Sequence, residues 1–143
     1  MNDESAIREL VNRYIASIEA KDAAAATACY TSDVVAYDLA PPLEMGPTEV
    51  RNPANIQEWF DTWEGPIKSE ARNLTVKVGG NVAYAFSLHH MTGKKRDGES
   101  ADLWFRATAA FLKDNGEWKI SHIHNSVPFA MDGTGKALGN LKP

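Results

Sequence analysis

The sequence has little cysteine and no long apolar run, and each absence excludes a class of protein. Cys29 is the only cysteine among 143 residues. The chain therefore cannot form an intramolecular disulfide, and we expect a reducing, cytoplasmic compartment. No apolar stretch approaches the length that spans a bilayer, and the first residues are acidic where a secretory signal would be basic. We therefore expect no membrane partner and no export by a signal peptide.

An excess of positive charge is also missing. The formal net charge is −4 and the isoelectric point is about 5.5, which opposes binding to a phosphate backbone. The one dense basic cluster, residues 94–96, stands beside Asp97 and Gly98 and is typical of a hairpin turn. We expect no nucleic-acid partner.

Motifs for covalent catalysis and for phosphate binding are absent as well. Cys29 has no neighbouring histidine in the sequence, and Ser126 lacks the G-x-S-x-G elbow of a serine nucleophile. Gly133 and Gly135 lie near the end of the chain, without the strand and helix that a phosphate loop requires. These observations give little support to nucleophilic catalysis or to a phosphate loop, and we expect no cofactor.

What is present begins with helical periodicity. An apolar stripe predicts an amphipathic helix capped by Asp3 or Ser5, with Ile7, Leu10, Val11, Tyr14, Ile15 and Ile18 on one face. Asp22 predicts the start of a second helix that runs to about residue 30, and residues 34–39 predict a short strand. A stiff proline-rich loop follows at 40–47. A third helix is predicted from Asn52 and Pro53 to Gly65, with an apolar face formed by Ile56, Trp59, Phe60 and Trp63.

From Ser69 onward the apolar period changes from helical to alternating, which indicates strands. The pattern predicts strands up to residue 78, from 82 to 90, from 99 to 112 and from 118 to 127, with turns between them. Successive hairpins form a largely antiparallel sheet, and the helices must cover one of its faces, so the predicted class is α+β. We expect one domain over residues 1–143, with a core from about 5 to 128 and a mobile or partner-docked tail over 129–143.

The last two strands have the most informative pattern. Alternation places Asp102, Trp104, Arg106 and Thr108 on one face of the first strand and His122, His124 and Ser126 on one face of the second. A three-residue turn at 114–116 would set Arg106 opposite His124, whereas a two-residue turn at 115–116 would separate the two sets. If both sets share an internal face, they line a polar pocket.

The order of these elements, together with Gly116, Trp118, Lys119 and Ile120 in a Gly-x-Trp-Lys-Ile sequence, resembles the nuclear transport factor 2-like superfamily. Within it, the chain is similar to the branch of SnoaL-like polyketide cyclases and ketosteroid isomerase. The resemblance implies a cone-shaped fold in which a curved, mostly antiparallel sheet wraps around three N-terminal helices. It also implies a cavity open at one end and a homodimer formed through the sheet.

The resemblance extends to individual residues. In ketosteroid isomerase a tyrosine of the first helix donates a hydrogen bond to the developing enolate, and an aspartate of the first short strand moves the proton. Tyr14 and Asp38 stand at these positions. The family's protonated aspartic acid on the third long strand has no counterpart in residues 106–110. The ending at 122–126 and an inward arginine resemble another branch, which includes the association domain of calcium/calmodulin-dependent protein kinase II and binds small acids.

Two functional hypotheses follow. The first is a cofactor-free isomerase, cyclase or lyase that moves a proton next to a carbonyl in a small organic ligand, either a carboxylate or an enone. Its predicted catalytic residues are Asp38, Tyr14 and His124. The predicted substrate-binding residues are Arg106, His122, His90, Trp59, Trp104, Phe86 and Ser126. The second hypothesis is a module without catalysis, which binds a small acid or serves assembly.

Each candidate also has a structural alternative. Tyr14 could be a core tyrosine, Asp38 a turn-capping residue, and Arg106 the partner of an acidic residue on an outer face. His89 points away from His90, so at most one of these two belongs to the pocket, and His90 shares the predicted apolar face. His122 and His124 have the i, i+2 spacing of metal ligands on a strand, with His90 or Asp38 as a further ligand. Without a clear third ligand, we expect no metal.

Overall fold

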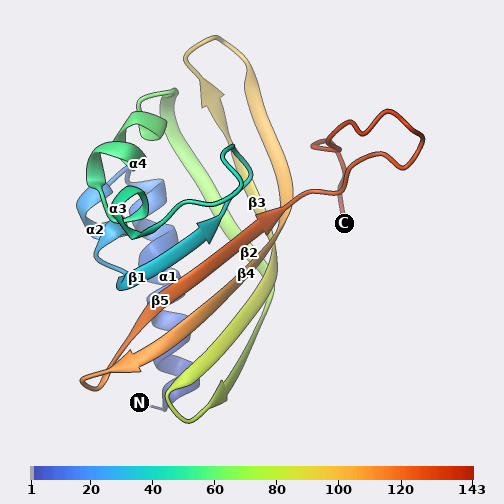
Figure 1. Ribbon diagram of the computed structural model, residues 1–143. Helices are drawn as coiled ribbons and strands as arrows, with labels where there is room; N and C mark the ends of the chain where they lie inside the picture. The colour runs from blue at the N-terminus through green and yellow to red at the C-terminus, as the bar shows by residue number, and fades with distance from the viewer. Residues whose placement is uncertain (1) are drawn as a thin grey trace.

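A computed structural model describes residues 2–143, in which four helices pack on one side of a five-stranded sheet (Figure 1). The helices are α1 (Asp3–Glu19), α2 (Ala23–Thr27), α3 (Pro47–Val50) and α4 (Pro53–Phe60). The strands are β1 (Tyr30–Tyr37), β2 (Trp63–Gly79), β3 (Val82–Lys95), β4 (Ser100–Asp114) and β5 (Glu117–Ser126). The predicted α+β class and the curved sheet around N-terminal helices are confirmed.

The residue that caps the N-terminus of α1 is Asn2, and not the predicted Asp3 or Ser5. The side chain of Asn2 accepts a hydrogen bond from the Ser5 backbone N–H at 2.7 Å, which satisfies an amide that the first turn leaves unpaired. Asp3 is not the cap because its Oδ1 accepts bonds from Trp118 Nε1 and Lys113 Nζ, each at 3.0 Å. Asp3 thereby ties α1 to the hairpin of β4 and β5.

Other boundaries shift for similar tertiary reasons. Asp22 caps α2 as predicted, accepting from the Ala25 amide at 3.0 Å, but α2 ends at Thr27. β1 begins at Tyr30, four residues earlier than predicted, because Tyr30 already pairs with Ile120 of β5. Similarly, Trp63 belongs to β2 and not to the third predicted helix.

The strands lie in the order β1-β5-β4-β3-β2. β2 to β5 form successive antiparallel pairs, and β1 pairs with β5 in parallel. The sheet curves around the helices, which cover only its concave face (Figure 1). We use "concave face" for this covered side and "convex face" for the opposite side.

The register of β4 and β5 depends on a turn and a bulge together. The connecting turn has two central residues, Asn115 and Gly116, with positive φ angles of 51° and 76°, as expected for a tight hairpin. Alone, this turn would place Arg106 and His124 on opposite faces. Ser121 is left unpaired in β5, however, and this bulge adds one residue to the register. Arg106 therefore pairs with Ser126, and the predicted shared face exists.

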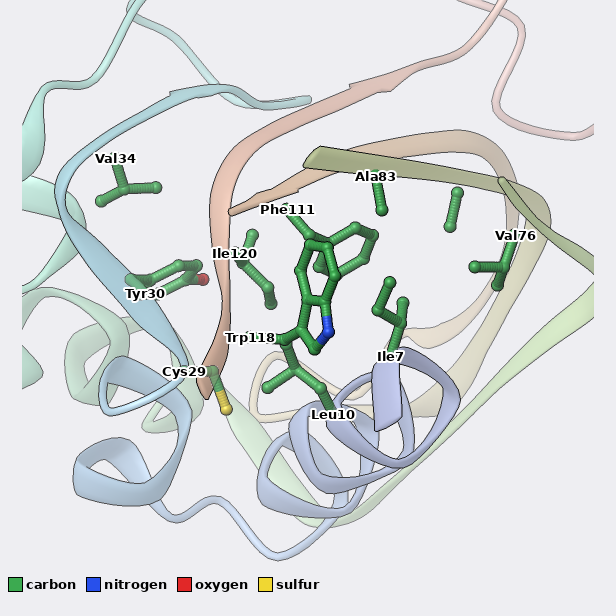
Figure 2. Packing of buried hydrophobic residues seen from close by; sticks show 11 residues of the cluster. Ile7, Leu10, Cys29, Tyr30, Val34, Val76, Ala83, Phe111, Trp118 and Ile120 are labelled. Carbon is green, nitrogen blue, oxygen red and sulfur yellow. The ribbon is translucent and has the colours of Figure 1, made fainter. Parts of the chain in front are cut away.

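The narrow end of the cone is filled by apolar side chains. Figure 2 shows Ile7 and Leu10 of α1 pointing toward Phe111, Trp118 and Ile120 of the sheet. All five are nearly or completely buried. Burying each of the aliphatic side chains contributes roughly 1.5–3 kcal/mol, so this cluster fixes α1 against the sheet. The space beyond the cluster stays open.

Residues 127–143 leave the sheet after β5 and form a loop that stands away from it (Figure 1). The Ala130 amide donates to the Lys136 carbonyl at 2.7 Å, which closes the loop on itself. Near the end of the chain, Lys142 lies 3.2 Å from the carboxylate of Asp102 on β4.

Candidate functional site

A cavity of about 600 Å³ lies between the helices and the concave face of the sheet. This volume is in the range of sites for small organic ligands. Its lining is mostly apolar and includes Val11, Ile15, Ile18, Ile56, Trp59, Trp63, Met91, Leu103, Phe105 and Phe111. Against these walls, each polar side chain that reaches the cavity has a large effect on what can bind.

Asp38 is one such polar group. It follows the buried Val34 and Ala36 at alternate positions, so its side chain points to the concave side, although it remains exposed to solvent. Its Oδ1 accepts hydrogen bonds from the Leu39 amide at 2.7 Å and from Asn125 Nδ2 at 3.2 Å. Within residues 2–143, no hydrogen bond engages Oδ2. One carboxylate oxygen is thus held while the other is free to contact a ligand.

Tyr14 and Tyr30 form a second polar group on the cavity wall. Their hydroxyl oxygens are 2.7 Å apart, and their rings meet edge to face at 5.7 Å. Burial raises the pKa of Tyr14 to about 12 and raises that of Tyr30 well above its ordinary value, and the negative charge of Asp38 adds to both shifts. Both phenols therefore keep their protons at neutral pH. The pair has two O–H groups and one bond between them, so one proton remains for a ligand.

His89 and Ser69 form a third polar group. Ser69 Oγ lies 2.5 Å from His89 Nε2, and the imidazole stacks on Phe105 with ring centres 5.0 Å apart. Burial lowers the pKa of His89 to about 4, and the opposing influence of the Glu70 carboxylate is smaller. At neutral pH the cavity therefore contains an uncharged imidazole.

Lys95 is the one lysine or arginine among the described cavity-lining residues. Its Nζ lies 4.0 Å from the centre of the Trp63 ring and donates to Thr62 Oγ1 at 2.9 Å. Burial lowers the pKa of Lys95. Nearby, the buried Trp63 Nε1 has no hydrogen-bond partner within residues 2–143.

Seven predicted site residues do not line this cavity. The structure places them on the convex face, and they are Phe86, His90, Trp104, Arg106, His122, His124 and Ser126. Alternation grouped them correctly, but the buried Phe105 and Phe111 of β4 point to the concave side, where Phe111 packs with Ile7 and Leu10 of α1. The neighbouring residues of opposite parity, Arg106 among them, therefore face outward. Their predicted position in the pocket is wrong.

Several of these side chains contact other residues of the convex face. Arg106 Nε donates to Ser126 Oγ at 3.1 Å and has no acidic partner within residues 2–143. His90 Nε2 lies 2.7 Å from Asp102 Oδ1, and its ring stacks on Trp104 with centres 4.1 Å apart. These contacts neither point to a ligand nor require one.

Two further features mark the convex face. Tyr37 of β1 packs edge to face against His122 and His124, with ring centres 4.7 Å and 5.4 Å apart. Along β3, four apolar side chains are exposed, and we call them the outer stripe: Val82, Tyr84, Phe86 and Leu88.

Of the predicted site residues, Tyr14, Asp38 and Trp59 line the cavity. Sequence reasoning missed Tyr30, Ser69, His89 and Asn125. The alternation of β3 could have selected His89 over His90 once its concave face was known, and Asn125 alternates with the inward Ile123. No signal in the sequence singles out Ser69.

Two kinds of feature are absent from residues 2–143. No group of three His, Cys, Asp or Glu side chains in this part of the chain is arranged to hold a metal ion. None of its helices is both long and apolar enough to span a membrane.

Comparison with known proteins identifies the family. The family model of the SnoaL-like domain matches residues 7–130. A nuclear transport factor 2-like protein of unknown function from Pseudomonas putida KT2440 is 33% identical, with a TM-score of 0.86 over 98% of this chain and 96% of that one. The chain therefore belongs to the SnoaL-like family of the nuclear transport factor 2-like superfamily. A comparison with curated proteins gave no match.

More distant structures share the fold alone. A provisionally assigned dehydratase of the same superfamily from Streptomyces avermitilis is 15% identical, with a TM-score of 0.77 over 90% of this chain and 97% of that one. A provisionally assigned scytalone dehydratase from Novosphingobium aromaticivorans is 12% identical, with a TM-score of 0.78 over 98% and 95%.

Proposed function

We propose that this protein is a cofactor-free enzyme that moves a proton next to a carbonyl in a small, largely apolar substrate. The observation that carries the proposal is the pairing of a carboxylate, Asp38, with an available phenolic proton, from Tyr14 and Tyr30, on one apolar cavity. The two groups are close enough for the charge of Asp38 to raise the pKa of both tyrosines. A base and a hydrogen-bond donor are the two groups that enolisation requires.

In the proposed step, Asp38 removes a proton from the carbon next to the carbonyl. The electron pair of the C–H bond moves into the C–C bond, and the carbonyl π electrons move onto oxygen. The Tyr14 hydroxyl, supported by Tyr30, donates a hydrogen bond to this developing enolate oxygen. Return of the proton to another carbon gives an isomerase, and loss of a leaving group gives a lyase. The geometry favours proton abstraction without selecting between these outcomes.

The ligand is an enone or another neutral ketone in this proposal, and not a carboxylate. The acid-binding hypothesis depended on Arg106, which lies on the convex face. The remaining cation, Lys95, is held by Thr62 and by the Trp63 ring. A carboxylate would also be repelled by Asp38, whereas a neutral ketone has no such cost.

The test measures exchange of α-protons for deuterium in 2-tetralone, an apolar aromatic ketone, by NMR in D₂O. Wild-type protein should accelerate exchange over buffer. Asp38→Asn should reduce the rate by about 100- to 10,000-fold, the usual contribution of a positioned base. Tyr14→Phe should reduce it by about 100- to 1,000-fold, through loss of the donor at the enolate oxygen.

Asp33→Asn is the matched control, because Asp33 is also a carboxylate of β1 but is exposed and bonded to Thr31 Oγ1 at 2.8 Å. This variant should exchange protons at the wild-type rate. Equal rates for wild-type protein and Asp38→Asn would refute the proposed role of Asp38.

We further propose that the convex face forms a homodimer. The outer stripe has exposed fractions of 55% for Val82, 49% for Tyr84, 47% for Phe86 and 37% for Leu88. A continuous apolar stripe of this kind is unusual on a monomer and typical of a surface that is covered by a partner. A second copy presents the same stripe, so two copies can cover each other about a twofold axis.

Sedimentation or light scattering tests the dimer. Wild-type protein should have twice the mass of the chain at micromolar concentration, and Phe86→Glu should be monomeric because it buries an unpaired charge in the interface. Leu43→Glu is the control, since Leu43 is 95% exposed in the proline-rich loop and away from the stripe. A monomeric wild-type protein would exclude this interface.

A further inference from the structure

His89 occupies a fixed position in the cavity. Its side chain lines the cavity from β3, and its ring is held by stacking on Phe105 and by the 2.5 Å contact of Nε2 with Ser69 Oγ. Ser69 itself is 8% exposed, and its backbone N–H donates to Glu19 Oε2 at 3.2 Å. The imidazole is therefore oriented from two sides, as is expected of a group that recognises a ligand.

The hydrogen bond to Ser69 determines where the imidazole proton lies. Within residues 2–143, Nε2 of His89 is the one hydrogen-bond partner of the Ser69 hydroxyl. If Nε2 were protonated, the buried hydroxyl would accept that bond and its own proton would have no acceptor, which is costly. The hydroxyl therefore donates to Nε2, and the proton of the neutral imidazole is on Nδ1.

Nδ1 has no hydrogen-bond partner in the described residues, although its side chain reaches the cavity. The same atom is not sealed within the protein, because the one buried polar side-chain atom without a partner in residues 2–143 is Trp63 Nε1. His89 thus presents a neutral N–H donor to whatever fills the cavity.

This donor is separate from the groups of the proposed reaction. Asp38 follows β1, whereas His89 is on β3, and both β5 and β4 lie between these strands. Three strand spacings correspond to roughly 14 Å along the sheet. The intervening wall is apolar, with Ala107, Ala109 and Ile123 among its residues. Asp38 and His89 therefore approach the cavity from different strands, with apolar wall between them.

We infer, resting on the proposed function of the cavity, that His89 and Ser69 form a specificity site in which Nδ1–H binds a second, acceptor oxygen of an uncharged substrate. The substrate class is then a ketone that also has an ether, carbonyl or hydroxyl oxygen remote from the reacting carbonyl. Ser69 acts as a positioning residue, because its hydroxyl sets the tautomer of His89.

The tautomer is tested first, by ¹⁵N NMR of the histidine rings at pH 7. His89 should have a protonated Nδ1 and an unprotonated Nε2. Ser69→Ala should shift the population toward the Nε2–H form, a change that a merely structural serine would not cause. A wild-type His89 protonated on Nε2 overturns the inference.

The second test compares two probes that differ in one oxygen. Quenching of the cavity tryptophans measures the affinity for 6-methoxy-2-tetralone and for 6-ethyl-2-tetralone, in which a methylene replaces the ether oxygen. Wild-type protein should prefer the methoxy compound by about 3- to 10-fold, the contribution of one hydrogen bond. His89→Phe keeps the aromatic stack but should remove this preference, and Ser69→Ala should weaken it.

His90→Phe is the matched control, because it changes the adjacent histidine on the convex face and should leave the preference unchanged. Equal wild-type affinity for both probes overturns the inference. Proton exchange distinguishes this result from a failure of the proposed function. Loss of the preference in His89→Phe with no effect of Asp38→Asn on exchange would retain the specificity site and reject the base.

Discussion

The two faces of one sheet show how similar residues acquire different roles. The concave face contains His89, Ser69 and Asn125 among apolar walls, whereas the convex face contains His90, Arg106 and Ser126 among exposed side chains. His89 and His90 are adjacent residues of β3, and they differ in which face of the sheet their side chains lie on. His89 is half-buried, stacks on Phe105 and is uncharged, while His90 is bonded to a carboxylate on the convex face. Environment decides the chemistry more than residue type does.

A pattern of polar and aromatic residues on a strand therefore does not identify the concave face of a curved sheet. Trp104 and Arg106 looked internal because a tryptophan has little use in water and a guanidinium has little use in a core. On the convex face, Trp104 stacks on His90, and the guanidinium of Arg72 lies 5.8 Å from its ring centre. A surface that forms a protein interface, as we propose for the convex face, accommodates the same residues as a binding site.

The largest effect should come from comparing two phenylalanines of the two faces. Phe111 is completely buried in the core cluster, and Phe86 is 47% exposed in the outer stripe. Phe111→Ala should reduce the free energy of unfolding by about 3–5 kcal/mol, because it leaves a cavity in the core. Phe86→Ala should cost less than about 1 kcal/mol in the isolated chain.

Urea unfolding at several protein concentrations provides the measurement. The cost of Phe86→Ala should grow with concentration, since a residue that stabilises a dimer contributes only where dimers form. A cost that is independent of concentration would contradict the homodimer. Equal costs for the two variants at low concentration would contradict the assignment of the faces.

A second comparison uses pH and the two adjacent histidines. The folded pKa of His89 is about 4, and its ordinary value is 6.5. Between these values the unfolded chain binds more protons than the folded protein. The contribution of neutral His89 is therefore complete above pH 6.5 and is lost as the pH falls toward 4. The loss should reach at most about 3 kcal/mol, from 1.36 kcal/mol per pKa unit.

Unfolding measured from pH 7 to 4 in the His89→Phe protein should lack this part of the pH dependence. The His90→Phe protein should keep it, because this variant retains His89 with its contacts to Ser69 and Phe105. If His89→Phe and wild-type protein lose stability equally as the pH falls, His89 is not buried in the neutral form, and the contrast between the faces weakens.

Much of the fold could be predicted from local pattern. The stripe of Ile7, Leu10 and Ile18 predicts the first helix, and Asp22 and Asn52 predict the starts of two others, because a helix start depends on residues within one turn. The start of β1 was missed, since Tyr30 becomes a strand residue by pairing with Ile120, ninety positions away. Such long-range pairing has no local signal.

The candidate site was less predictable than the fold. Tyr14 and Asp38 were found through the resemblance to the family, and Trp59 through its helical stripe. The residues of the β4–β5 hairpin were assigned to the wrong face of the sheet. The two-residue turn and the bulge at Ser121 together keep these residues on one face, but neither feature determines which face is concave. That choice depends on Phe111 packing under α1 and on Phe105 lining the cavity, which are properties of the assembled fold.

The smallest effect should come from Arg106, which the sequence predicts to bind the substrate. Its Nε contacts Ser126 on the convex face, and it does not line the cavity. Arg106→Leu should therefore bind 6-methoxy-2-tetralone within about twofold of the wild-type affinity and change the free energy of unfolding by less than about 0.5 kcal/mol, as is usual for exposed positions. Lys95→Met, which removes the cation at the cavity wall, is the informative comparison. A loss of binding in Arg106→Leu that exceeds the loss in Lys95→Met would mean that ligands reach the convex face, and the distinction between the two faces would have to be abandoned.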